Sequence, residues 1–486
     1  MSGPAGAQRL VRAARAEYGP GAPGATELAA CERRLHEPLR VALAGTLKAG
    51  KSTLLNALVG EEIAPSDATE CTRVVTWYRR ADAPRVEVVA DERRPLPVRR
   101  TDGRLTLDLA GIATDRVRQL EVGWPSALLG DYTVIDTPGM SSNTPGVSER
   151  TRQLLAPDDG ICPADVVVYL LHTVHDDDVA LLRLLRERMA AGTGPLGVVG
   201  VLSRADELGG ADDPADPLAA ARAASAALAA DPALAALHTQ FLPVSGRLAV
   251  RGRTLRQREF QALQALSAVP PADLAAALIS TGRFTAPERA LPVPAPERVR
   301  LIEDFGVSGI RFAVAMIRAG VGDAATLAEN LVRAGGLTDL QHIVATRFGE
   351  RNEQLKAHAA LRGLDRVLRR YRRPGTEQLA REVTARLADT HTFTELRTLA
   401  TLPGSRLTPA DRDRAAALLG DHGISAPRRL GLAPDAPPAE IHRTALRALR
   451  YWRDREADPR HDPITAAACR AAARSAEGVI ARTPAR

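Results

Sequence analysis

The segment Gly45–Ser52, with the sequence Gly-Thr-Leu-Lys-Ala-Gly-Lys-Ser, constrains the fold more than any other part of the chain. It follows a short apolar run, Val41–Ala44, and leads into a stretch with helical character, Ser52–Val59. A G-x-x-x-x-G-K-[ST] pattern forms a phosphate-binding loop when it joins a buried strand to a helix, and both neighbours are predicted here. The glycines allow backbone N–H groups to close around a phosphate, and the helix adds its positive N-terminal end.

Lysine is rare in this chain, which strengthens the interpretation of the loop. Lys48, Lys51 and Lys356 are the only lysines in the sequence, and the first two lie inside this loop. We predict that Lys51 reaches the β- and γ-phosphates of a nucleotide and that the Ser52 hydroxyl binds Mg²⁺. The loop residues predicted to contact the nucleotide are Gly45, Lys48, Ala49, Gly50, Lys51, Ser52 and Thr53.

Short apolar runs rich in β-branched residues alternate with helical stretches from Leu39 onward. The predicted strands are Val41–Ala44, Val74–Tyr78, Val86–Val89, Thr133–Ile135, Val166–Leu171, Val198–Leu202 and Phe241–Val244. The predicted helices between several of them are Ser52–Val59, Asp178–Met189 and Leu218–Ala230. Such alternation predicts an α/β domain with a mainly parallel sheet and helices on both faces.

The remainder of the chain has helical periodicity. No strand is predicted beyond about Gly252, and apolar stripes such as Ile310, Val314 and Ile317 recur at helical spacing. We therefore expect an N-terminal helical segment (residues 1–38) that joins a neck, a nucleotide-binding α/β domain (39–250), and an all-α neck and trunk (251–486).

A second motif follows a predicted strand and supplies the acidic residue and the glycine that a nucleoside-triphosphate site requires. The segment Thr133–Gly139, Thr-Val-Ile-Asp-Thr-Pro-Gly, sets an acid at the end of a buried strand and a glycine three residues later. We predict that Asp136 holds Mg²⁺ through water and that the N–H of Gly139 senses the γ-phosphate.

A switch loop rich in threonine and small residues, Ser66–Arg73, lies between these two motifs. A threonine hydroxyl in such a loop closes on Mg²⁺ and orients the attacking water. Thr72 is favoured for this role, with Thr69 as the competitor. The candidate catalytic residues are Lys51, Thr72 and Lys48, and the candidate Mg²⁺ ligands are Ser52, Thr72 and Asp136.

Two later segments indicate which base the site takes. Ser203-Arg-Ala-Asp206 follows an apolar strand, and Asp206 can accept hydrogen bonds from the N1–H and exocyclic amine of guanine, which adenine does not offer. Arg204 would lie along the base plane, while Ser203 stands where many GTPases carry Asn or Thr. Ser245-Gly246-Arg247 follows the next strand and resembles the loop whose backbone N–H contacts guanine O6. In this order the motifs favour GTP over ATP.

Composition excludes several other classes of protein. No charge-free run approaches the ~20 apolar residues of a membrane-spanning helix, and the N-terminus lacks the apolar core of a secretory signal. The four cysteines lie far apart, so neither a zinc site nor a disulfide framework is predicted. The formal charge of +7 comes from abundant arginine, and no RNA-binding module is recognisable. We expect a cytoplasmic protein that does not bind nucleic acid.

These motifs, together with Leu54–Glu62, resemble those of the bacterial dynamin-like GTPases. The amino-acid sequences of Gly45–Thr53, Ser203–Asp206 and Asp389–Leu396 are most similar to those of the isoniazid-inducible dynamin-like proteins of mycobacteria and other actinobacteria. They resemble in particular the smaller of the proteins encoded in the isoniazid-inducible operon. The resemblance covers nearly the whole chain. It implies GTP and GDP as ligands, association of GTPase domains as a homodimer or with a co-encoded dynamin-like partner, and peripheral action at the inner face of an anionic membrane, with a role in drug or envelope-stress tolerance.

One position departs from the family pattern. Eukaryotic dynamins carry a catalytic glutamine in the phosphate-binding loop, and the matching residue here is Leu47, which cannot orient water. Lys48 beside it could stabilise transition-state charge or contact a partner. Three interpretations stay open: a dynamin-like GTPase accelerated by dimerisation, a GTP-binding scaffold with little turnover, and a regulatory GTPase acting on RNA or ribosomes, which has the least support.

Three features outside the loop motifs allow a structural and a functional interpretation. His172, His175 and the acids Asp176–Asp178 are better explained as a strand end and a helix start than as a metal site. The arginines around Tyr371 are better explained as a solvated helix end than as a site for lipid phosphates. The turn Leu402–Pro409 offers two leucines that look exposed, so it is either an ordinary connection or a membrane-touching tip.

Overall fold

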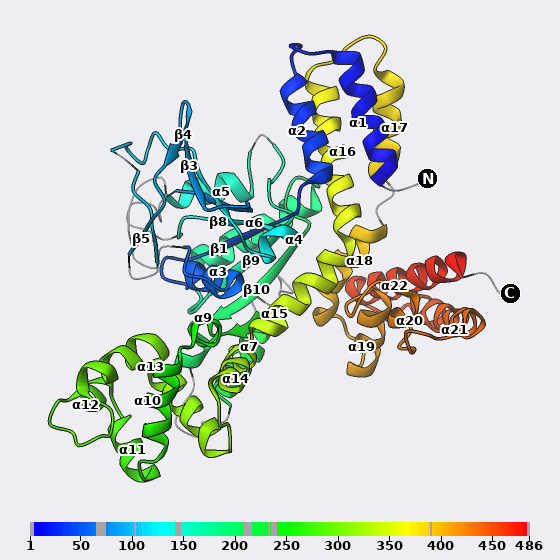
Figure 1. Ribbon diagram of the computed structural model, residues 1–486. Helices are drawn as coiled ribbons and strands as arrows, with labels where there is room; N and C mark the ends of the chain where they lie inside the picture. The colour runs from blue at the N-terminus through cyan, green and yellow to red at the C-terminus, as the bar shows by residue number, and fades with distance from the viewer. Residues whose placement is uncertain are drawn as a thin grey trace.

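The computed structural model describes residues 4–64, 74–101, 104–109, 111–140, 147–158, 160–208, 216–231, 234, 241–388 and 391–483. Thr69 and Thr72, the two candidate switch threonines, lie outside these residues. The described chain forms an α/β domain (residues 39–254) from which groups of helices extend (Figure 1).

A nine-stranded sheet forms the centre of the α/β domain, with the strand order β11-β10-β9-β1-β8-β2-β7-β3-β4. Its strands are β1 (Leu39–Gly45), β2 (Thr76–Arg80), β3 (Arg85–Val89), β4 (Arg93–Leu96), β7 (Gln119–Trp124), β8 (Tyr132–Asp136), β9 (Val166–Leu171), β10 (Gly197–Ser203) and β11 (Phe241–Val244). The run from β11 to β8 is parallel throughout. The mainly parallel sheet is therefore confirmed, while β4, β7 and the separate pair β5 (Arg99–Thr101) and β6 (Arg104–Thr106) were not predicted from the sequence.

Helices cover both faces of this sheet because its central strands are apolar on both sides. Alternate residues of β1 enter different cores: Val41 and Leu43 pack with α3 (Lys51–Val59) and α9 (Gly246–Thr254), while Ala42 and Ala44 face the opposite layer. That layer contains α5 (Val147–Leu155), α6 (Asp176–Ala190) and α7 (Ala219–Ala230). The period of two along an extended chain thus builds a three-layer domain from one apolar strand.

Past α9, every element that the structure assigns within the described residues is helical. A first group packs around a core of its own and comprises α10 (Gln257–Ser267), α11 (Pro271–Ala277), α12 (Thr281–Thr285), α13 (Ala295–Arg318) and α14 (Ala324–Ala334). A second group joins α1 (Pro4–Tyr18) and α2 (Ala25–His36) to α16 (Asn352–Arg370) and α17 (Glu377–Ala388). A third contains α18 (His391–Thr401), α19 (Pro409–Leu418), α20 (Ala426–Arg429), α21 (Pro438–Glu456) and α22 (Pro463–Arg482). Figure 1 shows the three groups projecting from the α/β domain separately.

One interrupted helical path connects these groups. It begins with α15 (Leu337–Ile343), passes through the π-helical turn η3 (Val344–Phe348) and the 3₁₀ turn η4 (Gly349–Arg351), and continues as α16. The Phe348 ring lies against β10, where a Cβ on Gly197 would come within 2.3 Å of it. The irregular turns therefore sit where the path leaves the α/β domain, and π-helical turns are frequent at functional positions.

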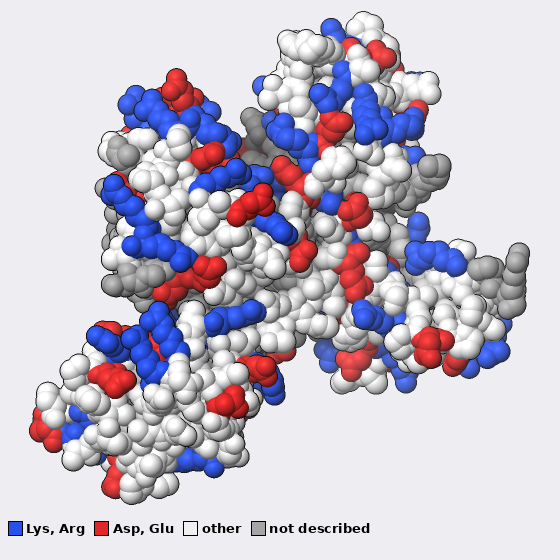
Figure 2. Space-filling view, in the orientation of Figure 1, with Lys and Arg blue, Asp and Glu red and all other residues white. Residues whose placement is uncertain are grey.

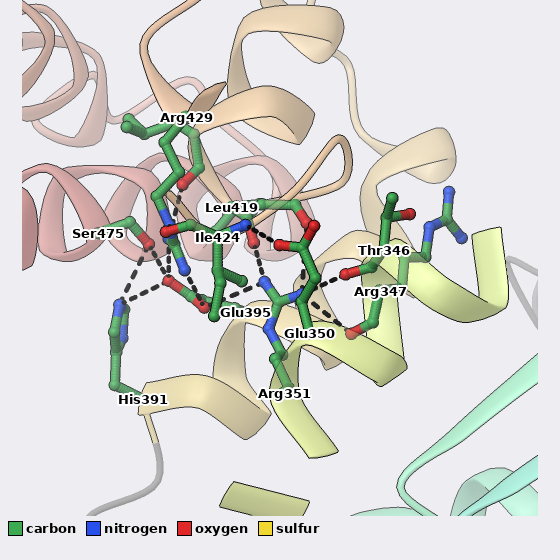
Figure 3. A network of polar contacts seen from close by, with 12 residues as sticks. Thr346, Arg347, Glu350, Arg351, His391, Glu395, Leu419, Ile424, Arg429 and Ser475 are labelled. Atoms are coloured by element: carbon green, nitrogen blue, oxygen red, sulfur yellow. Dashed lines mark hydrogen bonds and ion pairs between the residues drawn. The ribbon is translucent and has the colours of Figure 1, made fainter. Parts of the chain in front are cut away.

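A buried cluster of charges fixes the third helical group to this path (Figure 3). The Glu395 carboxylate of α18 accepts hydrogen bonds from Arg429 at 2.5 and 3.0 Å, from Ser475 at 2.8 Å and from Arg351 at 3.4 Å. Arg351 in turn donates to the carbonyl oxygen of Leu419 at 2.6 Å. Burial opposes the charge of Glu395, but His391, Arg429 and Arg351 together hold its pKa well below the usual range.

The turn Leu402–Pro409 is a packed connection and not an exposed tip. Leu402 is 4% exposed and Leu407 is 6% exposed, because both side chains enter the core formed with α19, α21 and α22. The membrane-tip interpretation of this turn is therefore wrong. Its backbone is fixed as well, since the N–H of Arg406 donates to the Thr465 hydroxyl at 2.8 Å.

Replacing Glu395 should destabilise the third helical group strongly. In Glu395→Gln, two buried guanidinium groups lose their counter-charge, and removing one partner of a buried pair costs about 3–5 kcal/mol. We expect a lowered midpoint in urea denaturation at pH 7. Since the folded-state pKa is depressed, the stabilisation is present above the unfolded pKa, so the gap between wild type and variant should shrink as the pH falls below about 4.

The matched control is Glu477→Gln, which removes an exposed carboxylate of α22 paired with the exposed Arg453 of α21 in the same helical group. Surface pairs contribute about 1 kcal/mol or less, so this variant should unfold close to the wild type. Equal midpoints for Glu395→Gln and Glu477→Gln would contradict the role assigned to the buried cluster.

Candidate nucleotide-binding site

The phosphate-binding loop begins where β1 meets β9 closely. Gly45 has a φ of 147°, and a Cβ there would lie 2.1 Å from the carbonyl oxygen of Leu170. Only glycine fits this position without displacing the strand. Lys48 and Gly50 both take the left-handed conformation, with φ of 62° and 86°, and α3 then starts at Lys51. The sequence motif therefore folds as a tight turn directly into a helix N-terminus.

Lys51 is a buried cation with neutral partners. Its side-chain nitrogen donates to the carbonyl oxygens of Gly45 at 3.1 Å and Thr46 at 3.0 Å. Desolvation lowers its pKa, while the charges of Asp136 and Asp178 act in the opposite direction. Within the described residues, no carboxylate forms an ion pair with it. A buried ammonium of this kind is stabilised by an anionic ligand.

Asp136 is the last residue of β8 and lies beside the phosphate-binding loop, with one carboxylate oxygen that lacks a hydrogen-bond partner among the described residues. Its Oδ2 is 3.5 Å from the Ser52 hydroxyl, whereas Oδ1 is buried without a hydrogen-bond partner among the described residues. Desolvation raises the pKa of this carboxyl to about 6, opposed by Lys51 and by the hydrogen bond from Ser52. A carboxylate and a hydroxyl are hard oxygen ligands, so the pair fits Mg²⁺ shared with phosphates. Among the described residues, no three metal-ligating side chains lie together.

Gly139 lies against the phosphate-binding loop. A Cβ at this position would be 2.8 Å from the Cα of Leu47, so a larger residue would push into the loop. The next residue fixes the contact, since Met140 accepts from the N–H of Leu47 at 2.9 Å and donates to Gly45 at 3.2 Å. Two backbone hydrogen bonds therefore join the segment after β8 to the loop.

The segment after β10 places Asp206 in the same cavity. Asp206 is 3% exposed and lies in the 3₁₀ turn η2 (Ala205–Glu207). Arg204 adopts a φ of 53° and binds Glu207 at 2.7 Å, so its guanidinium is held at the rim. The Ser203 hydroxyl donates to the carbonyl oxygen of Leu171 at 3.0 Å, which gives this residue a structural role in addition to lining the cavity.

Ser245 and Gly246, both predicted to contact the base, lie differently relative to the cavity. The N–H of Ser245 donates to the carbonyl oxygen of Gly335 at 2.9 Å, and its hydroxyl caps α9 by accepting from Leu248. Ser245 is fully buried behind the cavity, whereas Gly246 lines it. Of the two residues, only Gly246 therefore borders the cavity, and Ser245 fixes the start of α9 behind it.

These segments surround a cavity of about 430 Å³. The predicted site residues that line it are Lys48, Ala49, Gly50, Lys51, Ser52, Thr53, Asp136, Gly139, Ser203, Arg204, Asp206 and Gly246. Gly45 supports the loop from behind. Glu207 and Arg247 also line the cavity, although neither was among the predicted contact residues. Their positions, one residue after Asp206 and after Gly246, are the sequence signal that could have found them.

A second hollow of about 580 Å³ opens on the outer side of the loop. Leu47, which is 46% exposed, borders it together with Lys48, His175 and Asp176. His175 caps α6, and its N–H donates to Asp178 at 2.9 Å, so these residues start a helix as predicted. Leu47 thus presents an apolar side chain at the mouth of the site, where it contributes no hydrogen-bonding group.

Comparisons with known proteins agree with this geometry. Residues 41–199 match the Dynamin family. The isoniazid-induced protein IniC of Mycobacterium tuberculosis is 45% identical over 458 residues, which cover 93% of this chain and 92% of that protein. A bacterial dynamin-like protein of Nostoc punctiforme is 52% identical over 40 residues, or 8% of this chain and 6% of that protein.

Among solved structures, one described as an oligomerised bacterial dynamin pair for long-range sensing and tethering of membranes aligns with 98% of this chain and 75% of its own, at 11% identity and a TM-score of 0.32. No described helix is both long enough and apolar enough to cross a membrane. The sequence identity to IniC over nearly the full length of both proteins, together with the matching nucleotide domain, shows that the chain belongs to the dynamin family and carries its GTPase domain.

Proposed function

We propose that this chain binds GTP with Mg²⁺, hydrolyses it, and couples the nucleotide state to movement of its helical groups at the inner face of a membrane. The observation that carries the proposal is the juxtaposition of two buried, incompletely satisfied charges. The Lys51 ammonium donates hydrogen bonds only to carbonyl oxygens among the described residues. Asp136 follows Ser52 by 84 residues in the sequence and lies beside its hydroxyl, and Asp136 Oδ1 has no hydrogen-bond partner among the described residues. Mg²⁺ and a triphosphate would satisfy both groups together.

The residues of the chain divide the chemistry of hydrolysis among them. Bound Mg²⁺ would neutralise charge on the β- and γ-phosphates. Lys51 and the loop N–H groups hold the phosphates in line, and the N–H of Gly139 lies beside the loop to contact the γ-phosphate. Lys48 is exposed at the rim and can add positive charge as the leaving group departs. Leu47 has no polar group, so we propose that Thr72 and a facing GTPase domain orient the attacking water.

Arg247 supplies a route from the nucleotide to the helices. It lines the cavity, lies 3.6 Å from Glu207, and its guanidinium lies 2.6 Å from the Cβ position of Gly306. Gly306 interrupts α13 with a φ of 65° and a ψ of 175°, so the helix is kinked at that point. A shift of the base-binding segment would therefore reach the kink through one side chain.

A second arginine on α9 reinforces this route. Arg251 binds Glu62, after α3, at 3.0 Å and Asp304 of α13 at 3.1 Å. It thereby joins the helix that follows the phosphate-binding loop to the first helical group. We propose that these two arginines transmit nucleotide-dependent motion. The partner would be a second GTPase domain, from another copy or a co-encoded dynamin-like protein, and contact with anionic lipid would be peripheral. A role in isoniazid or envelope-stress tolerance, proposed from the name of the relative, is tested by comparing drug survival with and without the gene.

Lys51→Ala should abolish tight nucleotide binding. Loss of a buried charge-assisted contact to phosphate costs about 1.5–3 kcal/mol, which corresponds to a 10- to 150-fold weaker affinity for GDP and GTP in calorimetric titration. Lys356→Ala is the matched control, because Lys356 is equally buried but pairs with Glu353 on α16. The control should bind nucleotide normally. Unchanged affinity in Lys51→Ala would refute the assignment of the loop.

Asp206→Asn should reduce the discrimination between guanine and hypoxanthine. The wild-type carboxylate accepts from both N1–H and the 2-amino group, whereas an amide oxygen leaves the second donor poorly paired. We expect GDP to weaken by about 100-fold and the preference for GDP over IDP to collapse. Asp176→Asn, on the rim of the neighbouring hollow, should keep that preference. An unaltered GDP-to-IDP ratio in Asp206→Asn would remove this residue from the base site.

The second candidate function, a GTP-binding scaffold with little turnover, is favoured by the apolar Leu47 at the mouth of the site. Turnover separates the two functions. If hydrolysis is completed by a facing domain, the rate per molecule should rise at least about tenfold with protein concentration, a partner or liposomes, since charge supplied in trans is worth about 10³–10⁵ in phosphoryl transfer. A slow rate that is the same under all these conditions would establish the scaffold.

A further inference from the structure

The outer surface of the hairpin formed by α21 and α22 carries arginines that no acidic residue interrupts. The chain has no aspartate or glutamate between Glu440 and Asp454 on α21, and none between Asp462 and Glu477 on α22. The six arginines of these two stretches are all exposed: Arg443, Arg447, Arg450, Arg453, Arg470 and Arg474. The two helices pack side by side in the third helical group (Figure 1).

Helical geometry gathers the arginines of α21 on one face. Arg443, Arg447 and Arg450 are separated by four and by three residues, so they form a row about 10 Å long on one side of the helix. The opposite side is buried through Ala445 and Trp452. The row is therefore held outward by the core of the third helical group.

The arginines of α22 continue this surface. Arg470 and Arg474 are four residues apart and share one face, while Ala472 on the other side of the helix is fully buried. The exposed ion pair between Arg453 of α21 and Glu477 of α22 joins the two helices beside these rows. Both rows thus lie on the same outer surface of the hairpin.

The positive charge of this surface is only partly balanced. Arg453 pairs with Glu477, and Arg470 binds Glu456 at 2.9 Å. The other four, Arg443, Arg447, Arg450 and Arg474, form no ion pair with any described residue. Arg447 donates to the Thr444 hydroxyl at 2.9 Å, which leaves its charge uncompensated.

Arginines on the α/β domain differ in this respect. Over β3 and β4, basic and acidic side chains lie side by side (Figure 2). Arg93 there binds both Glu87 and Glu121 at 2.7 Å. Unbalanced charge is thus a property of the hairpin and not of arginine-rich surface in general.

The arginines around Tyr371, at the end of α16, also have partners within the molecule. Arg370 lies over the Tyr371 ring, 5.4 Å from its centre. Arg373 donates to the carbonyl oxygens of Glu17 and Tyr18, both at 2.9 Å. These groups hold the end of the helical bundle together, whereas the row on α21 has no such structural role.

The shape and chemistry of the hairpin surface fit a broad anionic layer. Neither α21 nor α22 exposes a large apolar side chain within the described residues, so the surface can attract anionic headgroups without inserting among the lipid tails. The aromatic rings of α21 are also occupied: Trp452 is buried, and Tyr451 lies between Arg414 and Arg455. The hairpin therefore lacks the free aromatic rings on which single-stranded nucleic acids stack.

We propose that the outer surface of α21 and α22 is the surface that this chain lays against an anionic membrane. The inference rests on the peripheral membrane contact of the proposed function and assigns that contact to named arginines. It also explains how the contact reaches the helical path. The Glu395 carboxylate accepts from Ser475 of α22 at 2.8 Å and from Arg351 of η4 at 3.4 Å, so buried contacts join the membrane-facing hairpin to the path that leaves the α/β domain.

The test measures binding of the full, GDP-loaded chain to vesicles by co-sedimentation. Mixed vesicles of phosphatidylglycerol and phosphatidylcholine are compared with vesicles of phosphatidylcholine alone, at low and at high salt. We expect binding to the anionic vesicles only. The binding should be lost at high salt, because the screening length falls from about 10 Å at 0.1 M to about 3 Å at 1 M ionic strength.

The test variant is Arg443→Gln with Arg447→Gln and Arg450→Gln. It should weaken binding to anionic vesicles about 30- to 100-fold, since each basic residue near an anionic surface contributes about fivefold. Arg474→Gln, on α22, should weaken binding about fivefold. This single variant tests whether both helices share the surface, and it serves if the triple variant does not fold. Calorimetric affinity for GDP should stay unchanged in both variants.

The matched control is Arg9→Gln with Arg94→Gln and Arg99→Gln, which removes the same charge from exposed arginines outside the third helical group. It should bind anionic vesicles like the wild type. Unchanged binding in the test variants, or an equal loss in test and control variants, would overturn the assignment and leave the rest of the proposed function standing. A wild-type chain that binds GDP but no anionic vesicle would overturn both the assignment and the membrane contact on which it rests.

Discussion

The close approach of β1 and β9 at Gly45 is the constraint on which the nucleotide site depends. A Cβ at Gly45 would collide with the carbonyl oxygen of Leu170, so the chain turns sharply at the end of a central strand. Because β8 and β9 run parallel to β1, and β10 to β9, their carboxyl ends meet at one edge of the sheet. Asp136 and Asp206 reach the phosphate-binding loop for this reason, although the chain between them is long. The register of the parallel strands, more than any single contact, assembles the cavity.

Fully buried strands were the elements most easily predicted from the sequence. β9 was placed correctly because all six of its residues are apolar and buried, a pattern that needs no knowledge of neighbours. β4 contains Arg93 and Arg94, and β7 contains Gln119 and Glu121, so their pairing at the outer part of the sheet depends on tertiary contacts. In the site, too, the local motifs predicted most of the residues that line the cavity. The structural role of Ser245 was not predictable from its motif, because it depends on a hydrogen bond to Gly335, which is distant in the sequence. Leu402 and Leu407 look exposed in sequence only because the helices covering them are distant along the chain.

Two chemically different joints hold the helical groups: one joins the first group to the α/β domain, and the other joins the third group to the helical path at η4. On one side, Arg247 and Arg251 form ion pairs with Glu207, Glu62 and Asp304. The Arg247–Glu207 pair is the most exposed of them, so it can break and re-form at a smaller cost than a buried pair. On the other side, Glu395 lies in a buried cluster with two arginines that is costly to disrupt. One more exposed and one buried joint support the proposed coupling of the nucleotide state to motion of a particular helical group. The kink at Gly306 lies on the side of the more exposed joint.

Leu47 connects the chemistry of the site to its surroundings. A glutamine there would orient water within one molecule, whereas a leucine that is 46% exposed offers only apolar surface. Exposed apolar side chains at the mouth of a polar site are stabilised when another surface covers them. The same substitution that removes a catalytic group from the loop therefore adds a reason for a second domain to pack against it. Lys48, next along the loop, is held in the left-handed conformation and borders the hollow that such a domain would contact. The proposed dependence of hydrolysis on association rests on these two neighbouring residues.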